Sequence, residues 1–111
     1  MLVVKMTRAF EKRSRRLLSE SELADLIADV GFRPEAGDVI PGGGGVRKLR
    51  WGLGDKGKRG GARVLHLYLR HAGSLWLLDI YAKSEKTNLS AADMKALRAT
   101  VAAIKAAERP A

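Results

Sequence analysis

The spacing of apolar residues in the first third of the chain predicts one strand followed by two helices. Residues 2–6, LVVKM, are short, apolar and partly β-branched, which is typical of a strand. Residues 7–18 carry apolar side chains at near-helical spacing among many cations, which predicts a short basic helix. Residues 19–32 predict a longer helix, because one stripe follows the i, i+3, i+4, i+7 pattern: Leu23, Leu26, Ile27 and Val30.

The rest of the chain predicts a loop, three strands and a terminal helix. Residues 33–45 are rich in Pro and Gly and predict a loop. Strand-like runs follow at 46–51, 62–71 and 74–83, and the short HAG turn between the last two predicts a β-hairpin. Both hairpin strands are apolar on their two faces, so the sheet needs cover on both sides. Residues 89–108 predict a helix with an apolar stripe formed by Met94, Leu97, Val101 and Ile104.

Capping residues define the ends of the two longer helices. Ser19 and Glu22 have the spacing of a capping box, and Gly31 is placed to end the same helix. Ser90 is placed as the N-cap of the terminal helix, with Asp93 near its positive end. The element order is then β-α-α-β-β-β-α. It predicts an α+β fold over residues 1–111, a single domain whose small antiparallel or mixed β-sheet is packed by helices.

The formal net charge of +9 is unevenly distributed along the chain. Residues 42–70 carry +7 and residues 5–16 carry +5, whereas residues 19–38 carry −5. Concentrated positive charge attracts polyanions through release of their counterions, although the block at 5–16 also fits a solvated basic surface. Cysteine is absent, and no apolar run approaches the roughly 18 residues that span a bilayer. These features predict a cytoplasmic protein without a membrane segment.

Several familiar motifs occur in the sequence, but their neighbouring residues do not support the corresponding binding sites. Gly52, Gly54 and Gly57 match a dinucleotide fingerprint by letter, but a strand follows them where a helix is required. Two histidines five residues apart make a poor metal set, so we expect no metal and no cofactor. His66 alternates with apolar neighbours on its strand, which favours a structural role.

The remaining candidate is a group of cations at one corner of the predicted sheet. Arg63 begins its strand and Lys83 ends the antiparallel partner, so the hairpin brings these two ends together. The corner is expected to display Lys56, Lys58, Arg59, Arg63, Tyr81 and Lys83. Lys and Arg among glycines can bind phosphate through charge, planar forks and backbone N–H groups. An anion-binding loop without catalytic activity fits the same residues.

Three stretches resemble the RelE/HigB group of bacterial toxins within the RelE/ParE superfamily. They read EAGDVIPGGGGVRKLRW, GDKGKRGGARVLHLYL and LLDIYAKSEKTNLSAADMKAL, and the resemblance covers roughly residues 35–98. It implies a RelE-like fold and an endoribonuclease that cleaves mRNA in the ribosomal A site without a metal. The RNA 2′-OH would attack the adjacent phosphorus, and the 5′-oxygen would leave. The implied partners are the ribosome, mRNA and a cognate antitoxin that often carries a DNA-binding domain, so operator DNA is reached only through the antitoxin.

The resemblance also assigns roles by position. Lys56 and Lys58 match the loop lysines of the family's active site, Arg63 matches its phosphate-contacting arginine, and Lys83 matches a basic position after the last strand. Further RNA contacts are expected from Arg47, Lys48, Arg50, Arg59, Tyr81 and Lys86. Members often add a C-terminal Tyr or His that stacks on a base, but SEKTNLS contains no aromatic residue.

Three points stay open on the sequence alone. Tyr81 could replace the missing aromatic or be buried by strand alternation. The proton acceptor could be Glu85 or a lysine whose pKa neighbouring cations lower. A ParE-like toxin acting on gyrase and a non-catalytic RNA-binding module are the alternative functions.

Overall fold

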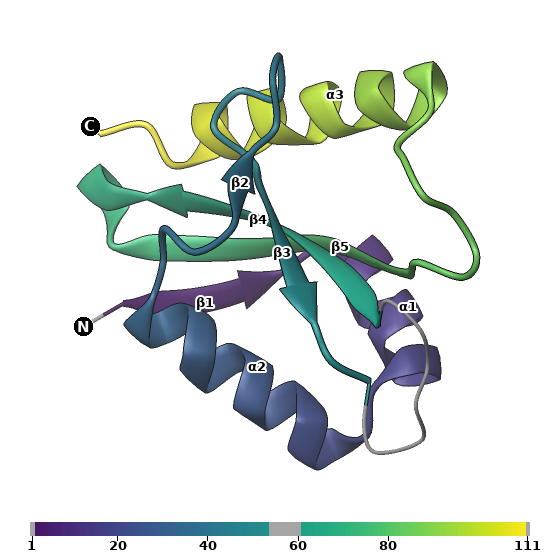
Figure 1. Cartoon of the computed structure of the whole chain (residues 1–111). Helices are drawn as coiled ribbons and strands as arrows, with labels where there is room; N and C mark the ends of the chain where they lie inside the picture. Colours follow the sequence, from purple (N-terminus) through teal and green to yellow (C-terminus); the bar gives the residue numbers. More distant parts are fainter. Residues whose placement is uncertain (1, 54–60, 111) are drawn as a thin grey trace.

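A five-stranded mixed sheet lies between helices on its two faces (Figure 1). The computed structural model describes residues 2–53 and 61–110. The helices are α1 (Arg8–Leu17), α2 (Glu20–Phe32) and α3 (Ala91–Ala107). The strands are β1 (Val3–Met6), β2 (Asp38–Val39), β3 (Arg47–Trp51), β4 (Ala62–Leu69) and β5 (Ser74–Ala82). The α+β class predicted from the sequence is confirmed.

The sheet has the order β1-β5-β4-β3-β2, and only β1 runs parallel to its neighbour. The predicted hairpin is confirmed, since β4 and β5 pair antiparallel along their length. Its turn is a short 3₁₀ helix, Arg70–Ala72, so β4 ends at Leu69 and not at residue 71 as predicted. The segment predicted as a loop contains one strand as well, because Asp38 and Val39 pair with the start of β3.

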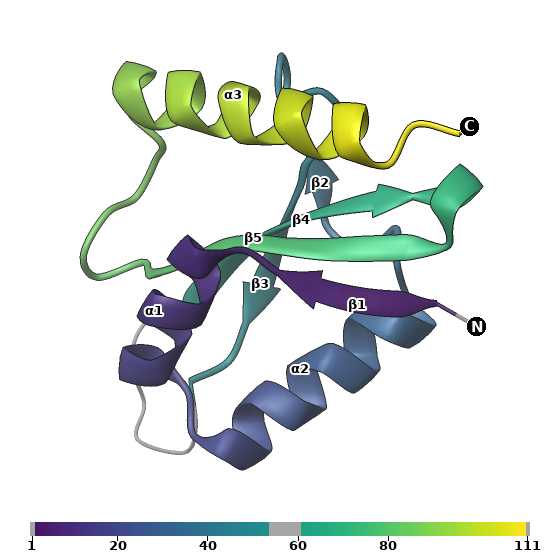
Figure 2. The ribbon, with the colours of Figure 1, turned by 180° about the vertical axis from the view of Figure 1, so that it is seen from behind.

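Helices cover both faces of the sheet, as the apolar hairpin strands require (Figure 2). On one face, α1 and α2 contribute the fully buried Phe10, Leu26 and Val30 to a core with strand residues such as Leu75, Leu77 and Ile80. On the other face, α3 packs Leu97, Val101 and Ile104 against strand residues such as Leu65, Leu67 and Leu78. The two faces therefore have separate apolar cores.

The predicted helix starts are confirmed by complete capping boxes. Ser19 and Glu22 exchange side-chain and backbone hydrogen bonds, and Ser90 and Asp93 do the same. The predicted end of α2 is wrong, because the helix continues through Gly31 to Phe32. Arg33 ends it instead: its backbone N–H donates to Asp29 O, and its guanidinium binds the Asp29 carboxylate at 2.6 Å.

Candidate functional site

Three of the predicted site residues lie in one row across the sheet. Arg50 on β3 pairs with Arg63 on β4, and Arg63 pairs with Tyr81 on β5. Directly opposite residues of antiparallel strands point to the same face. Tyr81 belongs to the core beneath α3, so the whole row faces the α3 side of the sheet.

Arg50 and Arg63 place two positive charges opposite one another on neighbouring strands. Like charges directly opposite on neighbouring strands repel one another. Arg50 is exposed, but only 6% of the surface of Arg63 is accessible, and arginine is rarely this buried. Its Nη1 donates to Ala62 O at 3.3 Å. A phosphate oxygen that reached both guanidinium groups would accept hydrogen bonds from both.

Two lysines lie beside the row, one on the same face of the sheet and one directly after the end of β5. Lys48 precedes Arg50 by two residues and pairs with Leu65, which also belongs to the α3-side core. Lys83 follows Tyr81 by two residues, and its backbone N–H donates to Gly61 O at 3.0 Å. This hydrogen bond joins the end of β5 to the start of β4, as the hairpin argument predicted. Together, Lys48, Arg50, Arg63, Tyr81 and Lys83 are called the cationic row below.

Tyr81 is buried instead of being presented to solvent. Only 4% of its surface is accessible, and Lys86 Nζ lies 5.4 Å from the centre of its ring. Burial raises the pKa of the phenol, and the nearby Arg63 charge partly opposes that rise. The hydroxyl is therefore protonated at neutral pH, and it has no hydrogen-bond partner among the described residues. The hydroxyl oxygen is itself buried, so the structure presents neither an open ring for base stacking nor an exposed hydroxyl at this position.

Other residues predicted to bind RNA lie in different surroundings. Arg47 pairs with His66 on the opposite face, where it donates to Gly37 O at 3.0 Å. Lys86 forms an ion pair with Asp93 at 3.0 Å and thereby ties the segment after β5 to the start of α3. Lys56, Lys58 and Arg59 lie outside the described residues. The sequence could not separate these environments, since strand face depends on pairing.

Glu85 and His66 are candidate proton acceptors among the described residues. The Glu85 carboxylate binds Arg16 Nη1 at 2.8 Å. His66 is fully buried on the other face, as the structural interpretation predicted, and its Nε2 lies 2.7 Å from Ala36 O. Burial lowers its pKa, and the hydrogen bond to Ala36 partly opposes that shift. Within residues 2–53 and 61–110, no three His, Asp or Glu side chains form a group that could hold a metal ion.

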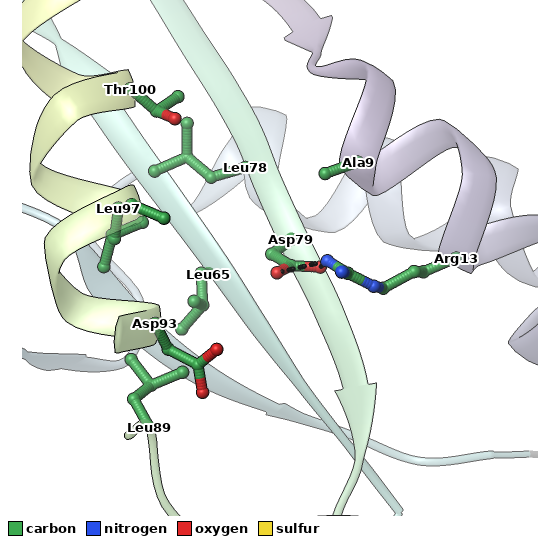
Figure 3. A pocket seen from close by; sticks show the side chains of 10 residues that line it. Ala9, Arg13, Leu65, Leu78, Asp79, Leu89, Asp93, Leu97 and Thr100 are labelled. Carbon is green, nitrogen blue, oxygen red and sulfur yellow. Dashed lines mark hydrogen bonds and ion pairs between the residues drawn. The ribbon is translucent and has the colours of Figure 1, made fainter. Parts of the chain in front are cut away.

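A separate pocket of about 200 Å³ lies between α1 and α3 (Figure 3). Its polar lining includes Arg13, Asp79 and Asp93, and its walls are mainly leucines. Arg13 Nη1 lies 2.6 Å from both Asp79 oxygens, and Asp93 accepts hydrogen bonds from Lys86 and the Ser90 backbone. These charges are already paired with one another. The pocket is also smaller than the roughly 300–1,000 Å³ of ordinary ligand sites, so the cationic row is the better candidate.

No helix in the described parts of the chain is long and apolar enough to cross a membrane. Comparison with protein families identifies one match, described as the RelE toxin of the RelE/RelB toxin–antitoxin system, over residues 1–110. The match extends beyond the 35–98 region on which the resemblance was first seen, and it includes every residue of the cationic row. The chain therefore belongs to the RelE family of toxins from toxin–antitoxin systems.

Proposed function

We propose that this toxin is a ribosome-dependent mRNA endonuclease that cleaves message in the ribosomal A site. The observation that carries the proposal is the opposed pair Arg50 and Arg63, with Tyr81 completing the row on β5. A partly buried site with several cations suits the trigonal-bipyramidal phosphorane of an in-line attack, because negative charge develops on its oxygens.

The proposed reaction needs little covalent chemistry from the protein. The RNA 2′-OH attacks the adjacent phosphorus, the bond to the 5′-oxygen breaks, and a 2′,3′-cyclic phosphate forms. Arg63 and Arg50 would hold the non-bridging oxygens, and Lys83 would add positive charge at the end of β5. Lys56 and Lys58 stay candidates for proton transfer.

The family membership supports the partners in this proposal. A toxin of this family has a cognate antitoxin, which we propose blocks the cationic row and contacts operator DNA through its own DNA-binding domain. Action on translating ribosomes would require the protein to work in the cytoplasm.

The decisive experiment compares two arginines on the same strand. Arg50→Gln removes a charge from the cationic row, and Arg47→Gln removes one from the opposite face. Each variant is induced in cells, and mRNA 5′ ends are mapped while growth is followed. We expect Arg50→Gln to lower A-site cleavage by about 10- to 100-fold, as loss of one charged hydrogen bond in the transition state would. Arg47→Gln should keep cleavage and growth arrest.

Three results would contradict the proposal. The first is that Arg50→Gln cleaves message as well as the wild type and that Arg63→Ala, tested in the same way, is also fully active. The cationic row would then have no part in catalysis. Growth arrest with intact mRNA and an induced DNA-damage response would instead favour a gyrase-directed toxin. Binding to ribosomes without cleavage or growth arrest would favour an RNA-binding module.

A further inference from the structure

The pocket between α1 and α3, called the α1–α3 pocket below, lies directly beside the cationic row. Leu65 on β4 and Asp79 on β5 lie opposite one another and both line it. Leu65 follows Arg63 by two residues, and the partner of Arg63 on β5, Tyr81, follows Asp79 by two. Residues two apart on a strand share a face and are separated by about 6.5 Å. A nucleotide whose phosphate lies at Arg63 can therefore place its base over the pocket.

The α1–α3 pocket has an apolar body and a polar end (Figure 3). Leucines of the sheet, of the segment before α3 and of α3 itself form the body: Leu65, Leu78, Leu89 and Leu97. The polar end lies on the side of α1, where Arg13 reaches toward Asp79. A flat apolar ring with polar atoms along one edge matches this division.

The ion pair at the polar end is fixed in position and still accessible. Arg13 Nη1 lies 2.6 Å from both Asp79 oxygens, and the backbone N–H of Ile80 donates to Asp79 Oδ1 at 2.8 Å. The side chains of Arg13 and Asp79 are 48% and 26% accessible. A carboxylate oxygen accepts more than one hydrogen bond, and a guanidinium has further N–H donors. The pair can therefore offer an acceptor and a donor side by side to a ligand.

The size and the lining of the pocket together favour a single nucleobase. Its volume of about 200 Å³ is below the roughly 300–1,000 Å³ of sites for larger ligands. Proteins read unpaired RNA bases by packing against the ring and by hydrogen bonds along its edge. Adenine and guanine each carry a donor beside an acceptor on that edge. Their two rings also bury more apolar surface against leucines than a single pyrimidine ring does.

Other ligand classes fit this lining less well. An anion would be repelled, because the carboxylates of Asp79 and Asp93 both line the pocket. A wholly apolar ligand would remove water from the Arg13–Asp79 pair without supplying a hydrogen bond, which is unfavourable. A base avoids both penalties, since it is uncharged and carries polar atoms at its edge.

We infer that the α1–α3 pocket binds a purine base of the message, next to the phosphate that the cationic row holds. The leucines enclose the rings, Asp79 accepts a hydrogen bond from an N–H of the base, and Arg13 donates to a ring nitrogen or carbonyl oxygen. This inference rests on the proposed function, which supplies the RNA. It adds specificity to that function, because the row binds any phosphate whereas the pocket selects the base beside it.

Two matched pairs of variants test the pocket without changing the row. Ala96 and Ala99 are both exposed on α3, but only Ala96 lines the pocket. Ala96→Leu should therefore fill the pocket, and Ala99→Leu is its control. Arg13→Gln removes the charged donor at the polar end, and Arg15→Gln removes an exposed arginine of α1 that lies outside the pocket lining.

The probes are short oligouridylates with a 2′-O-methyl group on every ribose, so that no 2′-OH is present to attack and the RNA stays intact. One contains uracil alone, and two carry a single central adenine or guanine. Affinities are measured by fluorescence anisotropy at one salt concentration, because phosphate contacts depend on salt. The wild type, Ala99→Leu and Arg15→Gln should bind at least one purine probe about 10-fold more tightly than the uracil probe. Ala96→Leu and Arg13→Gln should bind all three probes about equally.

The outcomes separate this inference from the proposed function. Equal affinity of the wild type for the three probes, or no measurable binding, would overturn the inference. A purine preference that survives in both Ala96→Leu and Arg13→Gln would also overturn it. Weaker binding of the purified antitoxin to Ala96→Leu, with RNA binding unchanged, would assign the pocket to a protein partner instead. A wild type that prefers purine probes but cleaves no message on ribosomes would sink the proposed function and leave the pocket intact.

Discussion

Glu108, just after α3, offers a quantitative test of how the helix is held over the face that carries the cationic row. Its carboxylate accepts hydrogen bonds from the Ser74 hydroxyl and the Trp76 indole N–H, and it binds Lys5 Nζ at 3.2 Å. Only 11% of its side chain is accessible. The hydrogen bond from Ser74 is the main reason why the pKa of Glu108 lies below its usual range, and Trp76 and Lys5 add to the shift.

The Glu108→Gln substitution keeps the shape and removes the charge. The glutamine side chain has a single oxygen, which can accept a hydrogen bond from Ser74 or from Trp76. The two oxygens of the carboxylate accept one from each. A hydrogen bond to a charged group contributes about 1.5–3 kcal/mol, and an ion pair to the half-exposed Lys5 contributes at most about 1 kcal/mol. We expect the free energy of unfolding to fall by about 2–3 kcal/mol at pH 7, and the melting temperature by roughly 10 °C.

Urea unfolding of the wild type and the variant at pH 7 and pH 3 measures this effect. An acid with a depressed pKa stabilises the fold above its unfolded pKa, about 4.3, and this contribution is lost as the pH falls through the folded pKa. The difference between wild type and variant should therefore narrow at pH 3. Asp25→Asn is the matched control, because Asp25 is an exposed helical acid. A Glu108→Gln protein as stable as this control at pH 7, or a deficit that is equally large at pH 3, would refute the reasoning.

Two further predictions concern His66 and the start of β4. Burial lowers the pKa of His66 in the folded protein, so as the pH falls this side chain is protonated in the unfolded chain before it is protonated in the folded one. The free energy of unfolding should therefore decline by up to about 1.4 kcal/mol for each pH unit below 6.5. Thermal melts between pH 7 and 5 should show this decline in the wild type and in the control variant His71→Gln, but not in His66→Gln. The same dependence of melting temperature on pH in all three proteins would contradict the prediction. Gly61 has φ +58°, and a Cβ added there would collide with a backbone oxygen of β3. The Gly61→Ala substitution should therefore lower the free energy of unfolding by at least about 2 kcal/mol. Gly52→Ala meets open space and should unfold like the wild type, and equal urea midpoints for the two glycine variants would refute the strain argument.

Local sequence signals predicted most of the secondary structure correctly. Ser19 with Glu22, and Ser90 with Asp93, define helix starts because capping depends on neighbours within one turn. Gly31 was misread for the same local reason. A glycine after an apolar stripe is a common helix end, but here Arg33 binds Asp29 and the helix keeps its last turn.

The candidate site was predicted only in outline. The hairpin geometry that joins Arg63 to Lys83 followed from strand order, and the Lys83–Gly61 backbone hydrogen bond confirms that meeting. The position of Arg47 on the opposite face did not follow, because it depends on pairing between β3 and β4. The burial of Tyr81 depends on α3, which lies far along the chain.

The sequence by itself determined the helix caps, the hairpin, the concentration of cations and the membership in a toxin family, because these depend on local spacing or on long matching stretches. Only the tertiary structure decided which cations share a face. A register shift in the β4–β5 pairing, between Leu65 and His66, sets which side chains lie opposite one another. Since a one-residue change of register reverses the face of a strand, the row of Arg50, Arg63 and Tyr81 exists only once three strands have paired.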